Sequence, residues 1–181
     1  HSFPIVSLVA EPDQLWNPVT GMLVPGGELS KVKIPFKKLD GSDPNYRDES
    51  IGKEPHEGHL EIYEKDGTQL VSQAVDFSLQ GQYSLDMPQK TFKVRAKAKY
   101  GEKYFNAKLF DDLEFTEYKS FVLRMSGNDC VWTRFNDAFQ SQLLKRFNAI
   151  SATPSTVIYQ EWQPVVVYLN GVYWGHYNLR E

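Results

Sequence analysis

The sequence has a single cysteine, Cys130, among its 181 residues. One cysteine excludes an intramolecular disulfide and a cysteine-rich zinc site. The chain also lacks any apolar run of about 18 residues, the length that a membrane-spanning helix needs. Its net charge of −3 offers no general basic face for phosphate backbones, so nucleic acid is not expected as the main partner.

Several motifs that carry chemistry are also missing. No G-x-S-x-G elbow, phosphate-binding G-x-x-x-x-G-K-[ST] loop or G-x-G-x-x-G turn is present, which leaves serine-hydrolase and Rossmann-type functions without support. His56 and His59 stand three apart in "HEGH" at the start of an expected strand, where such residues point to opposite faces. No metal site is predicted from them.

What remains is the composition of an ordinary globular domain, with 41% hydrophobic and 24% charged residues. We expect one domain over residues 1–181, with an exposed loop or insertion at 31–55, where Lys, Asp, Gly and Pro are concentrated. The chain starts at His1 without a methionine, so we expect that a leader or tag has been removed and that the protein is exported.

The periodicity of apolar residues predicts an α+β fold. Strands are expected at residues 3–9, 58–64, 71–80, 90–99 and 120–125, in an antiparallel meander. From Trp132 to Ile150 the apolar residues recur every three or four positions, which predicts one amphipathic helix that Asp129 or Thr133 caps. The expected architecture is an antiparallel β-sheet packed with this main helix.

The final stretch, "VVVYLNGVYWGHYNLRE", predicts a β-hairpin around Asn170 and Gly171, because a type I′ turn needs positive φ at both central residues. The expected register pairs Leu169 with Val172, Val167 with Trp174 and Val165 with His176. Both faces are apolar, so we expect one to meet the helix and the other a second lobe of the same parent protein or a second copy of this chain. His176 is expected to be a core or interface histidine.

In "PQKTFKVRAKAKYG" the alternation of a strand places Lys90 on the apolar face with Phe92 and Val94. A lysine there either extends its ammonium to solvent at the strand end or binds an anion, because an unpaired buried charge is costly. The outer row of lysines and arginine is a solvated face. The hairpin aromatics form either core or a platform for stacking sugar rings; they are Trp162, Tyr168, Tyr173, Trp174 and Tyr177.

Three segments together resemble a known family. "LQGQYSLDMPQKTFKVRAKAKYG", "FVLRMSGNDCVWTRFNDAFQSQL" and "PVVVYLNGVYWGHYNLRE" are similar, in order and spacing, to the N-terminal half of the CotH family of spore-coat-protein-H-like atypical kinases. The resemblance implies the small, nucleotide-binding lobe of an atypical protein kinase. In a full-length parent it implies phosphorylation of protein serine or threonine with ATP and a divalent metal, at a spore or cell surface.

The resemblance also assigns residues. Lys90 matches the lysine that contacts ATP phosphates, Asp137 is placed to pair with it, and Glu181 completes the cofactor-contacting set. The chain departs from the family at Leu85, where an arginine is usual, and at Asn136 in the helix motif. The family's metal-binding and catalytic acids lie beyond Glu181, so no catalytic residue is expected in this chain and no activity from it alone. The alternative is a non-catalytic coat-assembly or surface module that binds protein or carbohydrate.

Overall fold

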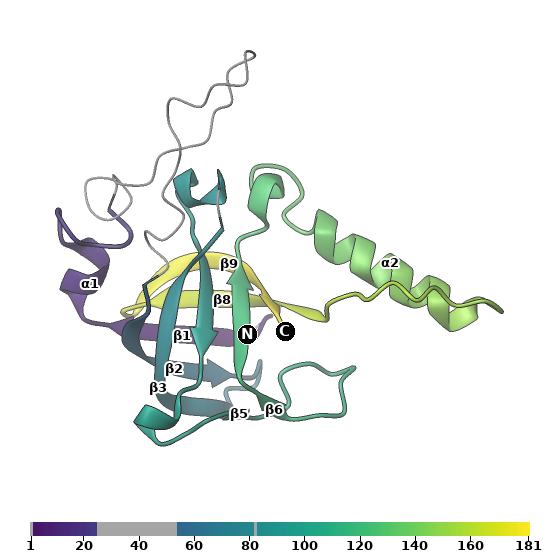
Figure 1. Ribbon diagram of the computed structural model, residues 1–181, viewed down its shortest axis with the longest axis horizontal. Coiled ribbons are helices and arrows are strands. Elements are labelled where there is room, and N and C mark those ends of the chain that lie inside the picture. The colour runs from purple at the N-terminus through teal and green to yellow at the C-terminus, as the bar shows by residue number, and fades with distance from the viewer. Residues whose placement is uncertain (1, 25–53, 82) are drawn as a thin grey trace, which may run out of the picture.

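The computed structural model describes residues 2–24, 54–81 and 83–181. Its strands are β1 (Ile5–Ala10), β2 (His56–Tyr63), β3 (Gln69–Gln80), β4 (Thr91–Arg95), β5 (Phe105–Asn106), β6 (Glu117–Tyr118), β7 (Ser120–Arg124), β8 (Trp162–Leu169) and β9 (Val172–Arg180). Its α-helices are α1 (Pro12–Trp16) and α2 (Asn136–Ile150), and short 3₁₀ turns are η2 (Tyr83–Asp86), η3 (Ala98–Tyr100) and η4 (Gly127–Asp129). In these residues seven strands form a closed barrel in the order β1-β2-β3-β4-β7-β9-β8, and β5 and β6 form a separate small sheet (Figure 1).

The five strands predicted from periodicity are present as β1, β2, β3, β4 and β7, with shifts of a few residues at their ends. Alternate side chains of the barrel strands point inward and are almost fully buried; they include Val6, Leu8, Leu60, Ile62, Val75, Phe77, Phe92, Val94, Phe121, Leu123, Val165, Val167, Tyr177 and Leu179. A barrel of about eight strands is just wide enough to be filled by such side chains. The hydrophobic core therefore lies inside the barrel.

The barrel closes through a pair of strands from opposite ends of the sequence. β1 runs parallel to β8, with Ile5 opposite Val166 and Leu8 opposite Leu169. The other neighbouring strands of the barrel are antiparallel. The predicted antiparallel meander is thus correct from β1 to β4, and the parallel closure is an addition to it.

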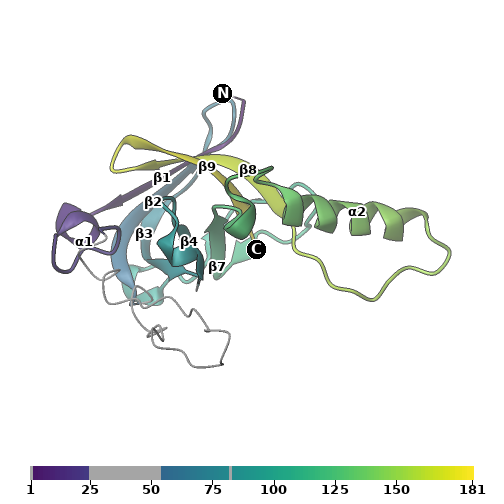
Figure 2. The same ribbon diagram turned by 90° about the horizontal axis from the view of Figure 1, so that it is seen from above.

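The predicted architecture of a sheet packed with a helix, resembling the small lobe of a kinase, is wrong. Figures 1 and 2 show α2 projecting to the side of the barrel, and Ala138 is its only buried residue. The apolar stripe of α2 is 48% to 86% exposed, at Phe135, Phe139, Leu143, Phe147 and Ile150. The physical reason is closure: the inner faces of the strands cover one another, so the sheet has no open apolar face for the helix to bury.

The closing hairpin has the predicted turn but not the predicted register. Asn170 and Gly171 have φ of 49° and 79°, and Leu169 pairs with Val172. A bulge then shifts the pairing by one residue, so that Val167 faces Gly175 and Val165 faces Tyr177. Because a one-residue shift turns every later side chain to the other face, Tyr177 enters the core and His176 is exposed. His176 is therefore not a core histidine, and the alternative of an interface histidine stays a prediction.

Two other expectations concern the predicted insertion and membrane-spanning helices. The insertion predicted at 31–55 falls at 31–53 outside the described residues. Within the described ranges, no helix combines the length and apolar character required to cross a bilayer, in agreement with the sequence.

Candidate functional site

Lys90 immediately precedes β4, and its side chain is buried at the end of the barrel. The residue is 5% exposed. Its ammonium donates to the backbone carbonyl of Leu85 at 2.6 Å and to that of Met87, so the turn at 85–87 folds over the charge. The hydroxyl of Tyr177 donates to the carbonyl of Lys90 at 2.8 Å, which fixes the backbone as well. One sequence interpretation had Lys90 extending its ammonium to solvent at the strand end. The structure contradicts it, because the side chain is buried.

Asp137 lies in the first turn of α2 and joins the helix to two barrel strands. Its Oδ2 accepts from Nε of Arg124, on β7, at 2.6 Å. Its Oδ1 lies 2.8 Å from Nη2 of Arg180, the last residue of β9, and accepts from the N–H of Ala138 at 2.9 Å. The structure thus pairs Asp137 with two arginines, while the ammonium of Lys90 donates to carbonyls of its own turn.

The loop that leads into α2 is held in an unusual conformation. Ser126 and Arg134 have φ of 83° and 64°, a region that residues other than glycine seldom occupy. The side-chain amide of Asn178, on β9, donates to the carbonyl of Arg134 at 2.9 Å and to Oγ of Ser126 at 3.2 Å. These bonds tie the loop to the barrel and fix the place where α2 begins.

The N-cap residue of α2 is Phe135, not Asp129 or Thr133 as predicted, but Asp129 accepts a hydrogen bond from the first N–H of the helix. Its Oδ2 accepts from the N–H of Asn136 at 3.0 Å and from the hydroxyl of Thr133 at 2.5 Å. These two hydrogen bonds, with that of Thr133 the stronger, hold the pKa of Asp129 below its ordinary value. Thr133 binds Asp129 rather than the helix itself.

The guanidinium of Arg180 is buried. Its side chain is 7% exposed, and its Nε and Nη2 are buried without a hydrogen-bond partner in the described part of the chain. Nη2 lies 2.8 Å from Oδ1 of Asp137 and forms an ion pair there. Burial lowers the pKa of Arg180; the Asp137 carboxylate opposes that shift and the charge of Arg124 adds to it.

A polar cavity of about 270 Å³ opens beside this ion-pair cluster. Its lining consists of Arg124, Asp137 and Arg180 with Gln80, Val122 and Gln160. Two guanidinium groups and one carboxylate leave one net positive charge in the lining. The arrangement suits an anion.

Glu181 follows Arg180 and is exposed. Its backbone carbonyl accepts from Nε2 of Gln160 at 3.4 Å, at the rim of the same cavity. Of the three residues expected to contact a cofactor, Asp137 thus lies in the arginine cluster, Glu181 lies beside it and Lys90 is enclosed by its own turn. Their cofactor contacts remain a prediction.

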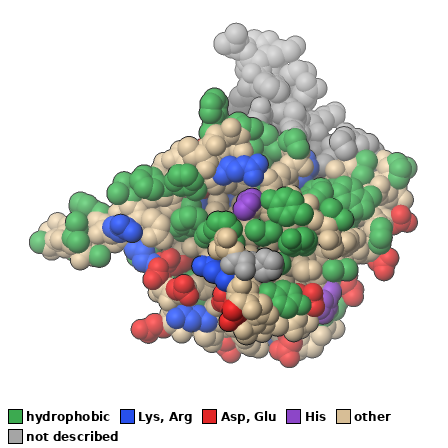
Figure 3. All heavy atoms as spheres, turned by 180° about the vertical axis from the view of Figure 1, so that it is seen from behind, with side chains coloured by type: hydrophobic (Ala, Val, Ile, Leu, Met, Phe, Trp, Pro, Cys, Tyr) green, Lys and Arg blue, Asp and Glu red, His purple; other side chains and the backbone are tan. Residues whose placement is uncertain are grey.

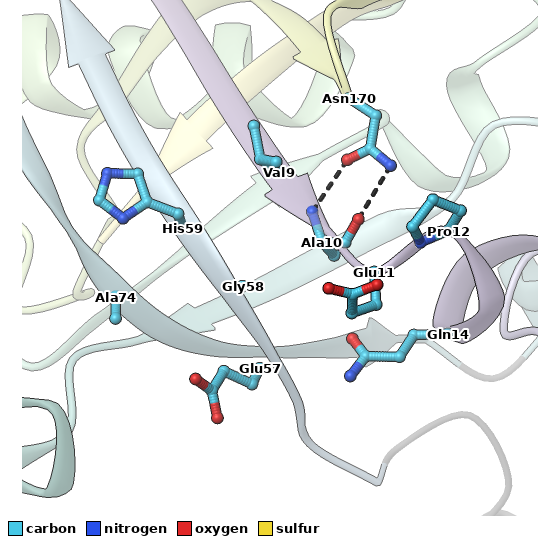
Figure 4. A pocket seen from close by; sticks show the side chains of 10 residues that line it. All are labelled: Val9, Ala10, Glu11, Pro12, Gln14, Glu57, Gly58, His59, Ala74 and Asn170. Carbon is cyan, nitrogen blue, oxygen red and sulfur yellow. Dashed lines mark hydrogen bonds between the residues drawn. The ribbon is translucent and has the colours of Figure 1, made fainter.

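A second, larger pocket lies at the other end of the hairpin, where Asn170 meets β1 (Figure 4). The Asn170 amide bonds to the backbone of Ala10, and Glu11 and Glu57 give the pocket an acidic lining. His59 also lines it and contacts Ser72 at 3.1 Å, whereas His56 stacks on Phe77 from the other face of β2. Across residues 2–24, 54–81 and 83–181, no group of three or more His, Cys, Asp or Glu side chains could hold a metal ion.

Sequence reasoning missed Arg124 and Arg180 as site residues. The sequence holds one usable signal: Arg180 is the only arginine, lysine or acid in β9. Simple alternation gives no reason to bury it, since the faces of β9 depend on a bulge that the sequence did not reveal.

The fold and the site together define a β-barrel domain with a projecting helix and an arginine-lined polar cavity. Residues 77–181, more than half of the chain, match the family described as CotH kinase protein. The chain belongs to this CotH family, as the resemblance of its motifs indicated. No curated protein matches the chain.

Proposed function

We propose that this CotH-family domain takes part in ATP-dependent phosphorylation of serine or threonine in spore-coat or cell-surface proteins, within a full-length parent. The observation that carries the proposal is the family match, which includes the strand after Lys90, the start of α2 and the closing hairpin. Catalysis of phosphoryl transfer is mostly positioning and neutralisation of phosphate charge. The role we assign to this domain is therefore to bind and orient the nucleotide.

The described residues fit the two expected cofactors differently. A phosphate fits the cavity beside Arg180, because that guanidinium has buried nitrogens without a hydrogen-bond partner. For a divalent metal, the described residues provide no cluster of three ligands, so we assign no metal-dependent step to them. ATP supplies the phosphoryl group, and the acids that hold metal and assist transfer are proposed to come from other parts of the parent.

The turn before β4 encloses Lys90, the residue proposed to contact ATP phosphates. The carbonyls of Leu85 and Met87 fix its ammonium, and Tyr177 fixes its backbone. Leu85, which stands where the family usually has arginine, is itself 2% exposed and packs into the core. Any phosphate contact by Lys90 then requires the turn at 85–87 to move or the phosphate to approach along it.

ATP binding tests the proposal. We expect ATP with Mg²⁺ to raise the melting temperature of the chain, and Lys90→Met to abolish that rise relative to the melting temperature of the same variant without ligand. Lys93→Met, three residues further along in β4, removes an equal charge from the half-exposed outer face and should leave the rise unchanged. A full-length parent that shows no ATP-dependent shift and transfers no labelled phosphate to protein would refute the proposal.

The second candidate is a non-catalytic module that binds protein or carbohydrate, and the outer face of the hairpin favours it. Tyr168 and Tyr173 stack edge to face at 6.0 Å, and His176 lies 6.2 Å from Tyr173 and 5.6 Å from Phe3. These rings line a cavity of about 320 Å³ on the outside of the barrel. Binding of soluble glycans that Tyr173→Ala abolishes, together with no response to ATP, would support this candidate over the kinase.

The same outer face is proposed as the partner surface of the hairpin, for a second lobe of the parent or a second copy of the chain. Val172 and Tyr173 are 65% and 53% exposed. Sedimentation analysis distinguishes the two: a dimer that Tyr173→Glu dissociates supports self-association, and a monomer at all concentrations eliminates it.

A further inference from the structure

We propose that the cavity formed by Arg124 and Arg180 is a binding site for a phosphate group. Lys90 is not in the lining of this cavity, and no motif indicated its two arginines. The phosphate site stands independently of the kinase proposal, because free phosphate can occupy it whether or not the parent transfers phosphate.

The first argument is charge. Asp137 is the only acid in the cavity lining, and it faces two arginines. Each of its oxygens is already engaged, Oδ2 with Arg124 and Oδ1 with Ala138 and Arg180. The carboxylate cannot neutralise both guanidinium groups, so one positive charge remains for a ligand.

The second argument is the state of Arg180. A guanidinium that is 7% exposed has lost most of its water; its Nε has no hydrogen-bond partner in the described part of the chain, and its Nη2 has only the ion-pair contact with Asp137. Buried donors without partners are costly and rare in native proteins. Phosphate oxygens match guanidinium geometry and accept two parallel hydrogen bonds, which removes that cost.

The third argument is that barrel strands hold the lining arginines of the cavity in place. Its arginines come from two neighbouring barrel strands, β7 and β9, with Arg124 directly opposite Asn178 in the register. Gly127, at a φ of 58°, leaves room for the guanidinium of Arg124. A Cβ added to Gly127 would lie only 3.0 Å from Nη2 of Arg124. Gln80 and Gln160 add neutral amides at the rim. The volume of about 270 Å³ admits a tetrahedral anion with some water, since one water takes about 30 Å³.

The test is direct binding of inorganic phosphate to the whole chain, measured by calorimetry at constant ionic strength and by the arginine Nε–H signals in NMR. We expect saturable binding, a shift of the Arg180 Nε–H signal, and at least a tenfold weaker affinity in Arg180→Met and in Arg124→Gln. Arg146→Gln removes an equal charge from the exposed surface of α2 and should leave the affinity unchanged.

Because Arg180 is buried, the Arg180→Met variant could fail to fold. Arg124 is half-exposed, so the Arg124→Gln variant provides a second measurement. The proposal is overturned if phosphate causes no shift of the Arg180 signal, or if folded Arg124→Gln binds phosphate as tightly as the unchanged chain.

ATP identifies the source of the phosphate. Competition between ATP and phosphate assigns the site to a nucleotide, and undiminished phosphate binding in saturating ATP assigns it to free phosphate; both outcomes support a phosphate site. If Lys90→Met abolishes ATP binding while phosphate still binds at Arg180, the nucleotide and phosphate sites are distinct. A full-length parent that neither binds ATP nor transfers phosphate, but still binds free phosphate at Arg180, would refute the kinase proposal and leave this one intact.

Discussion

The side chain of Asn170 forms two hydrogen bonds with the backbone of Ala10. The N–H of Ala10 donates to Oδ1 at 2.8 Å, and Nδ2 donates to the carbonyl of Ala10 at 2.9 Å (Figure 4). The residue that makes the hairpin turn therefore also extends the parallel pairing of β1 with β8, because its amide imitates a neighbouring strand. Its own N–H donates to the carbonyl of Leu8 at 2.9 Å.

We predict that Asn170→Gly destabilises the chain by about 1–3 kcal/mol, the value of two hydrogen bonds, while it keeps the turn. Asn170→Ala should cost more, because alanine also resists the φ of 49°. Chemical denaturation measures both. Equal stability of Asn170→Gly and the unchanged chain would show that the two bonds do not contribute to closure.

Gly175 provides a second prediction. It follows the bulge at a φ of 142°, and an added Cβ would lie 2.7 Å from Nε2 of Gln89, which donates to the carbonyl of His176 at 2.9 Å. Gly175→Ala should therefore lower the unfolding free energy by about 1–3 kcal/mol from backbone strain, with a further loss from the displaced amide.

The control for Gly175 is a double variant. Gln89→Ala removes the clash but not the strain, so the double variant should be more stable than the sum of the two single effects predicts. Strict additivity in thermal unfolding would mean that Gln89 does not limit the site.

The apolar stripe of α2 gives a third prediction, opposite to the one that its periodicity suggests. Phe139→Ser and Leu143→Ser should change the unfolding free energy of the isolated chain by only about 0.5 kcal/mol, because both side chains are more than half exposed. Phe92→Ala, inside the barrel, should cost about 3–5 kcal/mol. Figure 3 shows hydrophobic side chains along the projecting arm of the molecule, in agreement with an uncovered helix face. A loss above about 2 kcal/mol in Phe139→Ser would show that the stripe is packed.

Asp76 gives a prediction for acid stability. It is almost buried on β3, where burial raises its pKa, but hydrogen bonds from Lys99 at 2.9 Å and Tyr100 at 2.7 Å outweigh that effect and leave the pKa lowered. A carboxyl with a lowered pKa in the folded state stabilises the fold above its unfolded pKa, which is about 3.9, and loses that contribution as the pH falls through the folded pKa.

Asp76→Asn should accordingly destabilise the chain near neutral pH by about 1–3 kcal/mol, and the difference from the unchanged chain should shrink as the pH drops below 4. Denaturation curves at a series of pH values measure this. Asp111→Asn, at an exposed aspartate, serves as the matched control. A stability difference that does not vary with pH would show that the ion pair with Lys99 is not the source.

Local patterns identified most elements but not how they close. Alternation in "IVSLVA" and "FVLRMS" predicts strands that the structure contains, and Asn170-Gly171 predicts the turn, because side-chain period and φ preference are properties of a few neighbouring residues. The parallel pairing of β1 with β8 joins residues about 160 apart in sequence, as in the bond of Ala10 with Asn170, and no local pattern carries that information.

The candidate site shows the same division. The sequence singled out Lys90 and Asp137 through their family motifs. It could not indicate that Asp137 pairs with Arg124 and Arg180, because the bulge in the hairpin decides which face of β9 is buried.

The sequence by itself thus determined the strands, the helix, the hairpin turn and the CotH family, all of which depend on local pattern and motif. Only the tertiary structure decided that the sheet closes into a barrel, that α2 keeps its apolar stripe exposed and that two arginines share one carboxylate. Those features depend on contacts between distant segments, where a single bulged residue reverses which side chains meet.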